Sequence, residues 1–192
     1  MSKRMVVQQR FKGKKVLVTG ANGGIGSVLA ASLKKEGALV AVTDLDTSNI
    51  KADVHFDGDL LDPSFCDLLP SRVAKHFNGI DILFNNAGVI TRGKITDTSE
   101  EDYSVTMGVN VEAPFRLCRA VIPLMKPGSS IVNTASCWGL RPGPEHPLYV
   151  MSKASIASLT QCLGLDHAID GIRVNAVCPN EVNTNMIRSG FE

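Results

Sequence analysis

The stretch YVMSK places a phenol at Tyr149 and an amine at Lys153, four residues later. On a helix this spacing puts both side chains on one face. A free tyrosine has a pKa of about 10 and is a poor base at neutral pH, but a nearby positive charge stabilises its phenolate. Such a pair could take a proton from an alcohol or return one to a carbonyl. A lysine also follows a tyrosine at this distance by chance, in about one case in fifteen, so the rest of the chain must decide.

Ser136 is a second candidate for this chemistry. It follows an apolar run at the carboxyl end of a predicted strand, and its hydroxyl could hold the reacting oxygen by a hydrogen bond. Alternatively, Ser136 is a loop hydroxyl that satisfies its own backbone. The second tyrosine, Tyr103, has Met107 four residues on and forms no comparable pair.

Apolar runs alternate with helical patterns along the chain. The predicted strands lie at 14–20, 38–44, 53–59, 80–88, 129–136 and 172–179. The predicted helices lie at 24–37, 63–77, 99–107, 109–125 and 148–168. A break is expected at Pro70, and kinks are expected at Pro114 and Pro123. Continuous apolar strands are typical of a parallel sheet covered by helices on both faces, so the sequence predicts a doubly wound, Rossmann-type α/β fold.

The composition is ordinary for a globular protein. Of 192 residues, 44% are hydrophobic and 20% are charged, and the net charge is +1, so no overall field favours a nucleic acid or an anionic membrane. Basic residues cluster near the start, and we expect residues 1–13 to form a solvated basic arm, with a phosphate-binding arm as the alternative. Residues 14–192 are then expected to form a single dinucleotide-binding catalytic domain.

The five cysteines contain no C-x-x-C pair, which favours reduced thiols over disulfides or a zinc site. The N-terminus lacks an apolar signal segment, and no run reaches the length of a membrane span. We therefore expect a cytoplasmic protein without membrane contact. The histidines are scattered, and no metal site is predicted.

The glycine-rich turn TGANGGIG follows the first predicted strand and opens the first predicted helix. Glycines allow a tight turn and let backbone amides approach a pyrophosphate at the positive end of a helix. The residues of this turn predicted to contact a dinucleotide are Gly20, Asn22, Gly24, Ile25 and Gly26. A tight strand-to-helix turn also requires glycine for its own geometry, so the motif alone is weak.

Asp44 ends the second predicted strand, where its carboxylate can accept both ribose hydroxyls of an adenosine. The carboxylate would repel a 2′-phosphate, and no Lys or Arg stands at position 21, 22 or 45 to attract one. NAD is therefore favoured over NADP. Two alternatives remain open: Asp44 only caps the following loop, or Asp46 contacts the ribose instead.

TGANGGIG, NNAG (85–88), Asn110, Ser136 and YVMSK, in this order and spacing, resemble the short-chain dehydrogenase/reductase family from about Lys14 onward. The resemblance implies that Ser136, Tyr149 and Lys153 form a catalytic triad and that Asn110 joins a proton relay through water to Lys153. Tyr149 and Lys153 would also contact the cofactor, Lys153 at the nicotinamide ribose. Further cofactor contacts are implied at Asp59, Leu60, Asn86, Ala87, Gly88, Pro179, Val182 and Thr184.

The activity implied by this resemblance is NAD-dependent hydride transfer to or from a small secondary alcohol or ketone. A catalytically idle NAD-binding scaffold or sensor is the alternative, although a pure binder has no need of the Ser, Tyr, Lys and Asn set. Family members pair the helices corresponding to 109–125 and 148–168 across a twofold axis. Both segments here lack a charged face, and we expect a homodimer or homotetramer.

Two features depart from the family pattern. Asn180 stands where glycine usually follows the proline, and asparagine tolerates left-handed backbone geometry better than most residues. The chain stops at Glu192, where family members usually continue through two helices and a seventh strand. We therefore expect a C-terminally incomplete domain that lacks the last strand, with the run 172–178 as an exposed apolar edge.

The segments 137–140 and 141–148 are expected to wall a substrate pocket. Trp138 either stacks on the substrate or fills a gap. We interpret His146 as a polar loop residue rather than a catalyst, and Cys137 as a packing residue, because no histidine or helix N-terminus is evidently directed at it.

Overall fold

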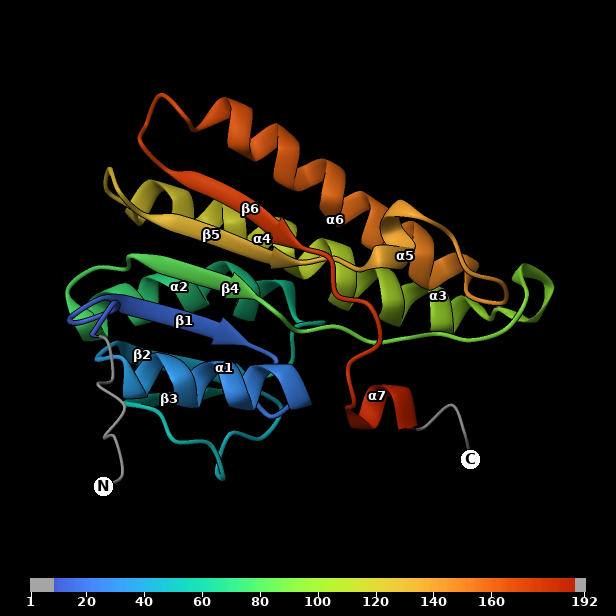
Figure 1. Ribbon diagram of the computed structural model, residues 1–192, viewed down its shortest axis with the longest axis horizontal. Helices are drawn as coiled ribbons and strands as arrows, with labels where there is room; N and C mark the ends of the chain where they lie inside the picture. The colour runs from blue at the N-terminus through green and yellow to red at the C-terminus, as the bar shows by residue number, and fades with distance from the viewer. Residues whose placement is uncertain (1–8, 189–192) are drawn as a thin grey trace, which may run out of the picture.

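One six-stranded sheet forms the centre of the molecule in the computed structural model, which describes residues 9–188 (Figure 1). All its strand pairs are parallel, and the order across the sheet is β3–β2–β1–β4–β5–β6. The strands are β1 (Lys15–Thr19), β2 (Leu39–Asp44), β3 (Val54–Asp57), β4 (Ile82–Asn85), β5 (Ser130–Thr134) and β6 (Arg173–Val177). Each overlaps a predicted strand, and the doubly wound fold is confirmed.

Helices connect the strands and cover both faces of the sheet (Figure 1). They are α1 (Gly24–Lys35), α2 (Pro63–Phe77), α3 (Glu100–Met107), α4 (Ala113–Val121), α5 (Cys137–Leu140), α6 (Pro147–Asp166) and α7 (Asn185–Arg188). Shorter turns are η1 (Ile95–Asp97), η2 (Gly108–Glu112) and η3 (Ile122–Leu124). At Pro123, where a kink is expected, the α-helical pattern of α4 gives way to the 3-10 turn η3. None of the helices between residues 9 and 188 is long and apolar enough to cross a membrane.

Each face of the sheet has its own hydrophobic core, because successive side chains of a strand point to opposite faces. Leu17, Leu83 and Ile131 pack with buried residues of α2 and α4. Val16 and Val18, on the other face, pack with residues of α1. A strand covered on both faces needs apolar residues at every position, which explains the continuous apolar runs in the sequence.

Helix α2 runs without a break through Pro70, so the break predicted there is wrong. Pro70 has no N–H to donate to the carbonyl of Cys66, one turn earlier. However, Cys66, Leu69 and Val73 are buried in one core, and α2 packs along α4. Burial of these side chains outweighs the loss of a single hydrogen bond, which contributes only about 1 kcal/mol.

The segment that carries Asn110 changes its helical pitch at this residue. In the π-helical turn η2, the N–H of Ala113 bonds to the carbonyl of Gly108 before α4 begins. Pro114 has no N–H to offer the carbonyl of Asn110, so a regular α-helical bond is impossible at this point. The kink expected at Pro114 is confirmed in this form, and π turns of this kind are frequent at functional sites.

Strand β6 lies at one edge of the sheet formed by the described residues and pairs only with β5. Arg173, Asn175 and Val177 are exposed along it. The edge position expected for this segment is confirmed among the described residues, but the edge is not apolar, because Arg173 and Asn175 are polar. The carboxyl ends of all six strands point to the same side, where the order of the sheet reverses between β1 and β4, and a ligand groove is expected there.

Candidate active site

A groove follows the carboxyl ends of the strands and consists of two adjoining hollows. The first, here called the glycine cleft, is lined among others by Gly20, Asn22, Gly24, Asp44, Asp59, Leu60 and Ala87. The second, here called the tyrosine pocket, is lined among others by Ile90, Ser136, Cys137, Trp138, Tyr149, Lys153, Pro179 and Val182. The two hollows adjoin, because both are lined by Ile25, Asn86, Gly88, Thr184 and Met186.

Helix α1 begins at the glycine cleft with its amide end open. Its N-cap is Gly23, no side chain in the described structure caps it, and its first turn carries no acidic residue. By contrast, Asp62 caps α2 and Ser99 caps α3. Uncapped N–H groups at the positive end of a helix are suited to an anion, so the residues present fit the pyrophosphate of a dinucleotide.

Three glycines of the turn bring backbone segments into close contact. A Cβ atom on Gly20, where φ is +63°, would lie 2.6 Å from the Cα of Ala87, and one on Gly24 would lie 2.6 Å from the Cγ2 of Thr184. A Cβ on Gly26 would overlap the carbonyl oxygen of Gly20. Gly20 and Gly24 line the cleft, whereas Gly26 does not, so the structure places Gly26 in the packing beneath it.

The Asp44 carboxylate faces the glycine cleft in a fixed orientation. Its Oδ2 accepts the N–H of Asn22 at 2.8 Å, and its Oδ1 accepts the N–H of Leu45 at 2.9 Å. A carboxylate has about four acceptor sites, so capacity remains for two ribose hydroxyls. Capping of the loop and a ribose contact are therefore compatible roles for Asp44. Asp46 accepts from the backbone N–H of Ser48 and does not line the cleft.

Asn86 joins the end of β4 to the glycine turn. Its Nδ2 donates to the carbonyls of Thr19 and Gly20, both at 3.1 Å. The Oγ1 of Thr19 in turn accepts the N–H groups of Asn86 and Ala87 at 3.0 and 3.1 Å. These bonds fix the floor of the cleft, which Gly88 continues toward the tyrosine pocket.

Ser136, Tyr149 and Lys153 converge on the tyrosine pocket. Tyr149 and Lys153 lie one turn apart near the start of α6, as their spacing predicts. The Nζ of Lys153 donates to the carbonyl of Thr134 at 2.8 Å and lies 5.8 Å from the centre of the Tyr149 ring. The Oγ of Ser136, just beyond β5, accepts the N–H of Trp138 at 3.2 Å.

Burial controls the ionisation of both members of the pair. It raises the pKa of Tyr149 above its ordinary value, and a hydrogen bond with Ser136 opposes this rise only in part. Burial also lowers the pKa of Lys153 to about 8. Desolvation is thus the main influence on the phenol, and stabilisation of the Tyr149 phenolate by Lys153 stays a prediction. A second positive charge in the groove would be needed to favour the phenolate.

Asn110 lies behind the pocket rather than in its wall. Its side chain is 1% exposed, its Oδ1 accepts the N–H of Val89 at 2.8 Å, and its Nδ2 donates to the Val89 carbonyl at 2.9 Å. A Cβ on Gly88 would lie 3.1 Å from the Nζ of Lys153 and 3.3 Å from the Oδ1 of Asn110. Asn110 therefore fixes the segment after β4 directly beside Lys153.

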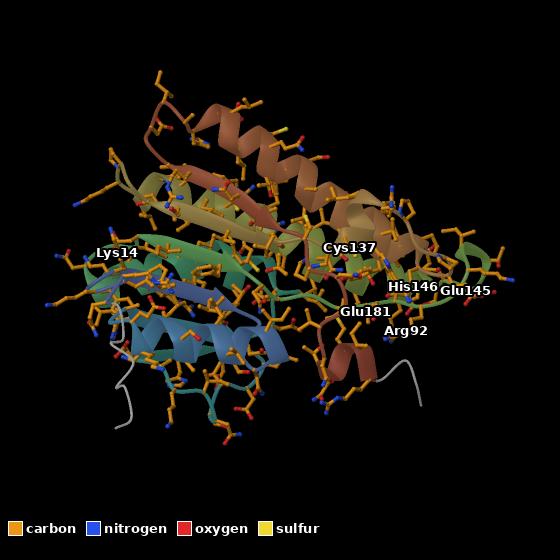
Figure 2. All side chains as sticks on the ribbon, viewed as in Figure 1. Lys14, Arg92, Cys137, Glu145, His146 and Glu181 are labelled. Carbon is orange, nitrogen blue, oxygen red and sulfur yellow. The ribbon has the colours of Figure 1, made fainter. Side chains whose placement is uncertain are left out.

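Trp138 forms an aromatic wall of the tyrosine pocket. Its ring centre lies 4.6 Å from that of His146 and 6.4 Å from that of Tyr149, edge-on. The loop that carries Glu145 and His146 extends beyond the carboxyl ends of the strands (Figure 2). The N–H of Gly93 donates to the Glu145 carbonyl at 2.7 Å, which joins this loop to the segment after β4. The wall expected from 137–140 is present at Cys137 and Trp138, whereas the wall expected from 141–148 is not found, because none of those residues lines the pocket; His146 instead contacts the Trp138 ring.

Asn180 does not adopt the left-handed backbone conformation. Among the described non-glycine residues only Asn78 and Glu145 have positive φ, so tolerance of that geometry is not what Asn180 contributes. Its Oδ1 instead accepts a hydrogen bond from the Sγ of Cys137 at 3.3 Å. The N–H of Cys137 donates to the Pro179 carbonyl at 3.0 Å. These bonds hold the exit of β6 against α5.

Three supporting residues were not predicted from the sequence: Thr19, Thr134 and Ser152. Thr19 holds the backbone of Asn86 and Ala87, and the carbonyl of Thr134 receives Lys153. Ser152 accepts a hydrogen bond from Asn110. Each contact joins residues far apart in the chain and follows no local pattern, and the only available signal was that Thr19 and Ser152 stand within the motifs TGANGGIG and YVMSK.

The strand order, the open helix end and the groove at the strand reversal place the chain among the Rossmann-type α/β proteins. A sequence profile described as short chain dehydrogenase matches residues 14–192. The chain belongs to the short chain dehydrogenase family.

Named relatives agree with this assignment. An uncharacterized oxidoreductase of Thermotoga maritima is 39% identical, over 88% of this chain and 72% of the relative. The meso-2,3-butanediol dehydrogenase of Serratia marcescens is 35% identical, over 92% of this chain and 74% of the relative. The fold also matches the crystal structure of a short chain dehydrogenase from Burkholderia cenocepacia in complex with NADP, with a TM-score of 0.87. The two sequences are 34% identical, and the match covers 92% of this chain and 78% of that chain.

Proposed function

We propose that the chain is an NAD-dependent oxidoreductase that transfers hydride between a nicotinamide and a small secondary alcohol or ketone, with residues 14–192 as one catalytic domain. Ser136, Tyr149 and Lys153 are assigned as its catalytic residues. The observation that carries the proposal is their convergence in one pocket, which adjoins a cleft that fits a dinucleotide. The substrate would then meet the nicotinamide where the two hollows join.

The pocket supplies a proton-exchanging group, Tyr149, and a hydrogen-bond donor to the substrate oxygen, Ser136. In the oxidising direction Tyr149 takes the hydroxyl proton of the substrate, and the Ser136 hydroxyl donates a hydrogen bond to the same substrate oxygen. In the reducing direction Tyr149 returns the proton to the ketone oxygen. A bound oxidised nicotinamide would accept hydride. Its positive charge would also stabilise the Tyr149 phenolate and so oppose the rise in the pKa of Tyr149. The Lys153 ammonium acts on the phenol in the same direction.

Asn110 is proposed to join a proton relay that leads from Lys153 through water. The support is its position, since it fixes the backbone at Val89 beside the Lys153 side chain. The π turn also leaves its carbonyl without the α-helical N–H of residue 114, which is a proline. A buried carbonyl in this position can accept a hydrogen bond from water.

NAD rather than NADP is the proposed cofactor. Asp44 holds its carboxylate toward the glycine cleft by two backbone hydrogen bonds and would repel a 2′-phosphate. Asp59, Leu60, Asn86, Ala87 and Gly88 would line the adenosine and pyrophosphate path, and Pro179, Val182 and Thr184 would line the nicotinamide side. The Burkholderia cenocepacia structure contains NADP, so measuring the dissociation constants of both cofactors tests this proposal directly.

The test of the proposed function is Tyr149→Phe. We expect turnover to fall by at least about a thousandfold, because the phenol assigned to exchange the proton is lost, while NAD binding stays within about threefold of wild type. Turnover is followed by absorbance of the reduced nicotinamide over a panel of secondary alcohols and ketones. Tyr103→Phe is the matched control, since Tyr103 lies on α3 and does not line the pocket. Comparable turnover in the Tyr149 variant would refute the assignment.

The alternative is an NAD-binding scaffold or sensor without catalysis. Burial raises the pKa of Tyr149, which is compatible with this function as well as with the enzyme. The two functions differ in one measurement, because a scaffold binds NAD but gives no reduced nicotinamide with any substrate of the panel. The convergence of Ser136, Tyr149 and Lys153 favours the enzyme.

A homodimer or homotetramer is the proposed assembly, in the cytoplasm. Helices α4 and α6 carry exposed apolar side chains in the single chain, including Phe115, Met151 and Leu165, the last of them 81% exposed. We infer that these exposed apolar side chains take part in the contact between subunits. Sedimentation as a monomer at micromolar concentration would contradict the proposal.

A further inference from the structure

Ser152 is completely buried between Tyr149 and Lys153 on α6, with 0% of its surface exposed. Its Oγ donates to the carbonyl of Tyr149 at 2.7 Å and accepts from the Nδ2 of Asn110 at 2.9 Å. One hydroxyl therefore links the first turn of α6 to the π turn that carries Asn110. Neither the glycine turn nor the proton chemistry of the pocket accounts for this residue.

The direction of the Ser152 hydroxyl determines how the Asn110 amide is oriented. The hydroxyl has one hydrogen, which the Tyr149 carbonyl takes, so toward Asn110 its oxygen can only accept. The NH2 group of Asn110 must then face Ser152, which leaves Oδ1 for the N–H of Val89. With its second hydrogen on the Val89 carbonyl, both hydrogens of the Asn110 amide and its oxygen have partners.

We propose that Ser152 is a positioning residue of the reaction centre, which holds Tyr149 and the Asn110 amide in register with Lys153. The inference rests on the proposed function but concerns a different group, since Ser152 does not line the pocket. Removal of its hydroxyl leaves a buried N–H of Asn110 without a partner. It also removes the side-chain hydrogen bond to the carbonyl of Tyr149. The phenol is then free to shift, and water can reach it.

The same helix contains a matched control, Ser155. Its hydroxyl also bonds back to a carbonyl of the preceding turn, that of Met151 at 2.9 Å, and this bond stays within α6. A serine whose hydroxyl only bonds to a carbonyl of its own helix should behave as Ser155 does. Ser152→Ala and Ser155→Ala therefore separate positioning from ordinary back-bonding.

The first readout is independent of turnover. The chain has two tyrosines, so Tyr103→Phe leaves Tyr149 as the single phenol, and 3-fluorotyrosine incorporation allows its ionisation to be followed by fluorine NMR against pH. Because burial is the main cause of the raised pKa of Tyr149, we expect Ser152→Ala to lower its apparent pKa and Ser155→Ala to leave it unchanged. Lys153 and Cys137, which lie beside the phenol, are the same in all variants.

The second readout is turnover of the wild-type and variant proteins with NAD. We expect Ser152→Ala to lower kcat about ten- to a hundredfold with the KM for NAD within about twofold, and Ser155→Ala to change neither. Ser152→Cys, whose thiol is a weaker donor and acceptor, should give an apparent pKa of Tyr149 and a kcat between those of wild type and Ser152→Ala. If wild-type protein shows no turnover, the proposed function fails, and the fluorine titration still decides the role of Ser152.

Two results would overturn the inference. In one, Ser152→Ala, or Ser152→Cys if the alanine variant does not fold, titrates and turns over as wild type does. In the other, Ser152→Ala and Ser155→Ala change both readouts equally. Circular dichroism at the assay temperature establishes beforehand that each variant is folded.

Discussion

The two ends of the groove are built by opposite means. At the glycine cleft, backbone segments approach one another because side chains are missing, as at Gly20 and Gly26. At the tyrosine pocket, polar side chains are buried almost completely and held by specific partners, as with Asn110 at 1% and Lys153 at 3% exposure. We therefore expect binding at the first end to depend on shape and backbone dipoles, and the proposed chemistry at the second end to depend on fixed side chains.

This difference predicts two kinds of failure on mutation. A substitution in the glycine turn adds atoms where there is no space, so it should disturb binding and folding together. A substitution behind the tyrosine pocket removes a hydrogen-bond partner, so it should disturb the ionisation and placement of a reacting group while the cleft still binds. The two kinds of variant can therefore be told apart by measuring binding, stability and turnover separately.

The largest effect is expected from Gly26→Ala. Its Cβ would overlap the carbonyl oxygen of Gly20, a backbone atom that cannot move without displacing the turn. We expect a loss of about 3 kcal/mol in the free energy of unfolding in urea and no detectable NAD binding by calorimetry. The matched control is Gly23→Ala, whose Cβ would lie 3.3 Å from the same oxygen at a φ of −73°.

Gly23→Ala should cost less than about 1 kcal/mol, because alanine adopts that backbone conformation readily. If both glycine variants unfold at the same urea concentration as wild type, the glycine cleft does not depend on missing side chains. Equal losses in the two variants would show a general intolerance of the turn rather than the specific overlap at Gly26.

The difference between the two ends also explains what the sequence could predict. Residues that act through backbone shape follow one another in the chain, so the spacing of Gly20, Gly24 and Gly26 was sufficient to predict their turn. Tyr149 and Lys153 were predicted for the same reason, since one helical turn joins them. The fold itself followed from the alternation of apolar runs and helical patterns.

The partners behind the tyrosine pocket could not be predicted in this way. Asn110 meets Ser152 across 42 residues, and Lys153 meets the carbonyl of Thr134 across 19. Such contacts depend on how α6 packs against η2 and β5, and no local pattern encodes that packing. The raised pKa of Tyr149 and the unbroken helix at Pro70 were missed for the same physical reason, because burial in the folded chain outweighed a local preference.

The next effect is expected at the tyrosine pocket, in the pH dependence of stability. Burial lowers the pKa of Lys153 to about 8, below its unfolded value of about 10.4, so the unfolded chain binds more protons between these values. Wild-type stability should therefore rise between pH 8 and 10, by about 2 kcal/mol. Lys153→Met removes the titrating group but keeps an unbranched apolar side chain, and the rise should disappear.

Urea unfolding at pH 8, 9 and 10 measures this slope. The series ends at pH 10, because the raised pKa of Tyr149 acts in the opposite direction above the ordinary value of a phenol, and stability is then lost as pH rises. Lys75→Met, an exposed substitution on α2, is the control and should keep the wild-type slope. An unchanged slope in Lys153→Met would show that Lys153 is better solvated than its burial indicates.

The smallest effect is expected from Asp44→Asn, which preserves the shape of the side chain at the rim of the glycine cleft. The amide replaces one of two oxygens that now accept the N–H groups of Asn22 and Leu45, and the negative charge that opposes a 2′-phosphate is lost. We expect the Kd for NAD to rise about tenfold, or about 1.4 kcal/mol, and the preference over NADP to shrink. Asp46→Asn, outside the cleft, should leave both dissociation constants unchanged in calorimetry.

A wild-type protein that binds NADP more tightly than NAD would contradict the role assigned to Asp44. Unlike Gly26→Ala, this variant adds no atoms, so its effect should appear in binding alone, and a concurrent loss of stability would mean that Asp44 acts mainly as a cap of its own loop.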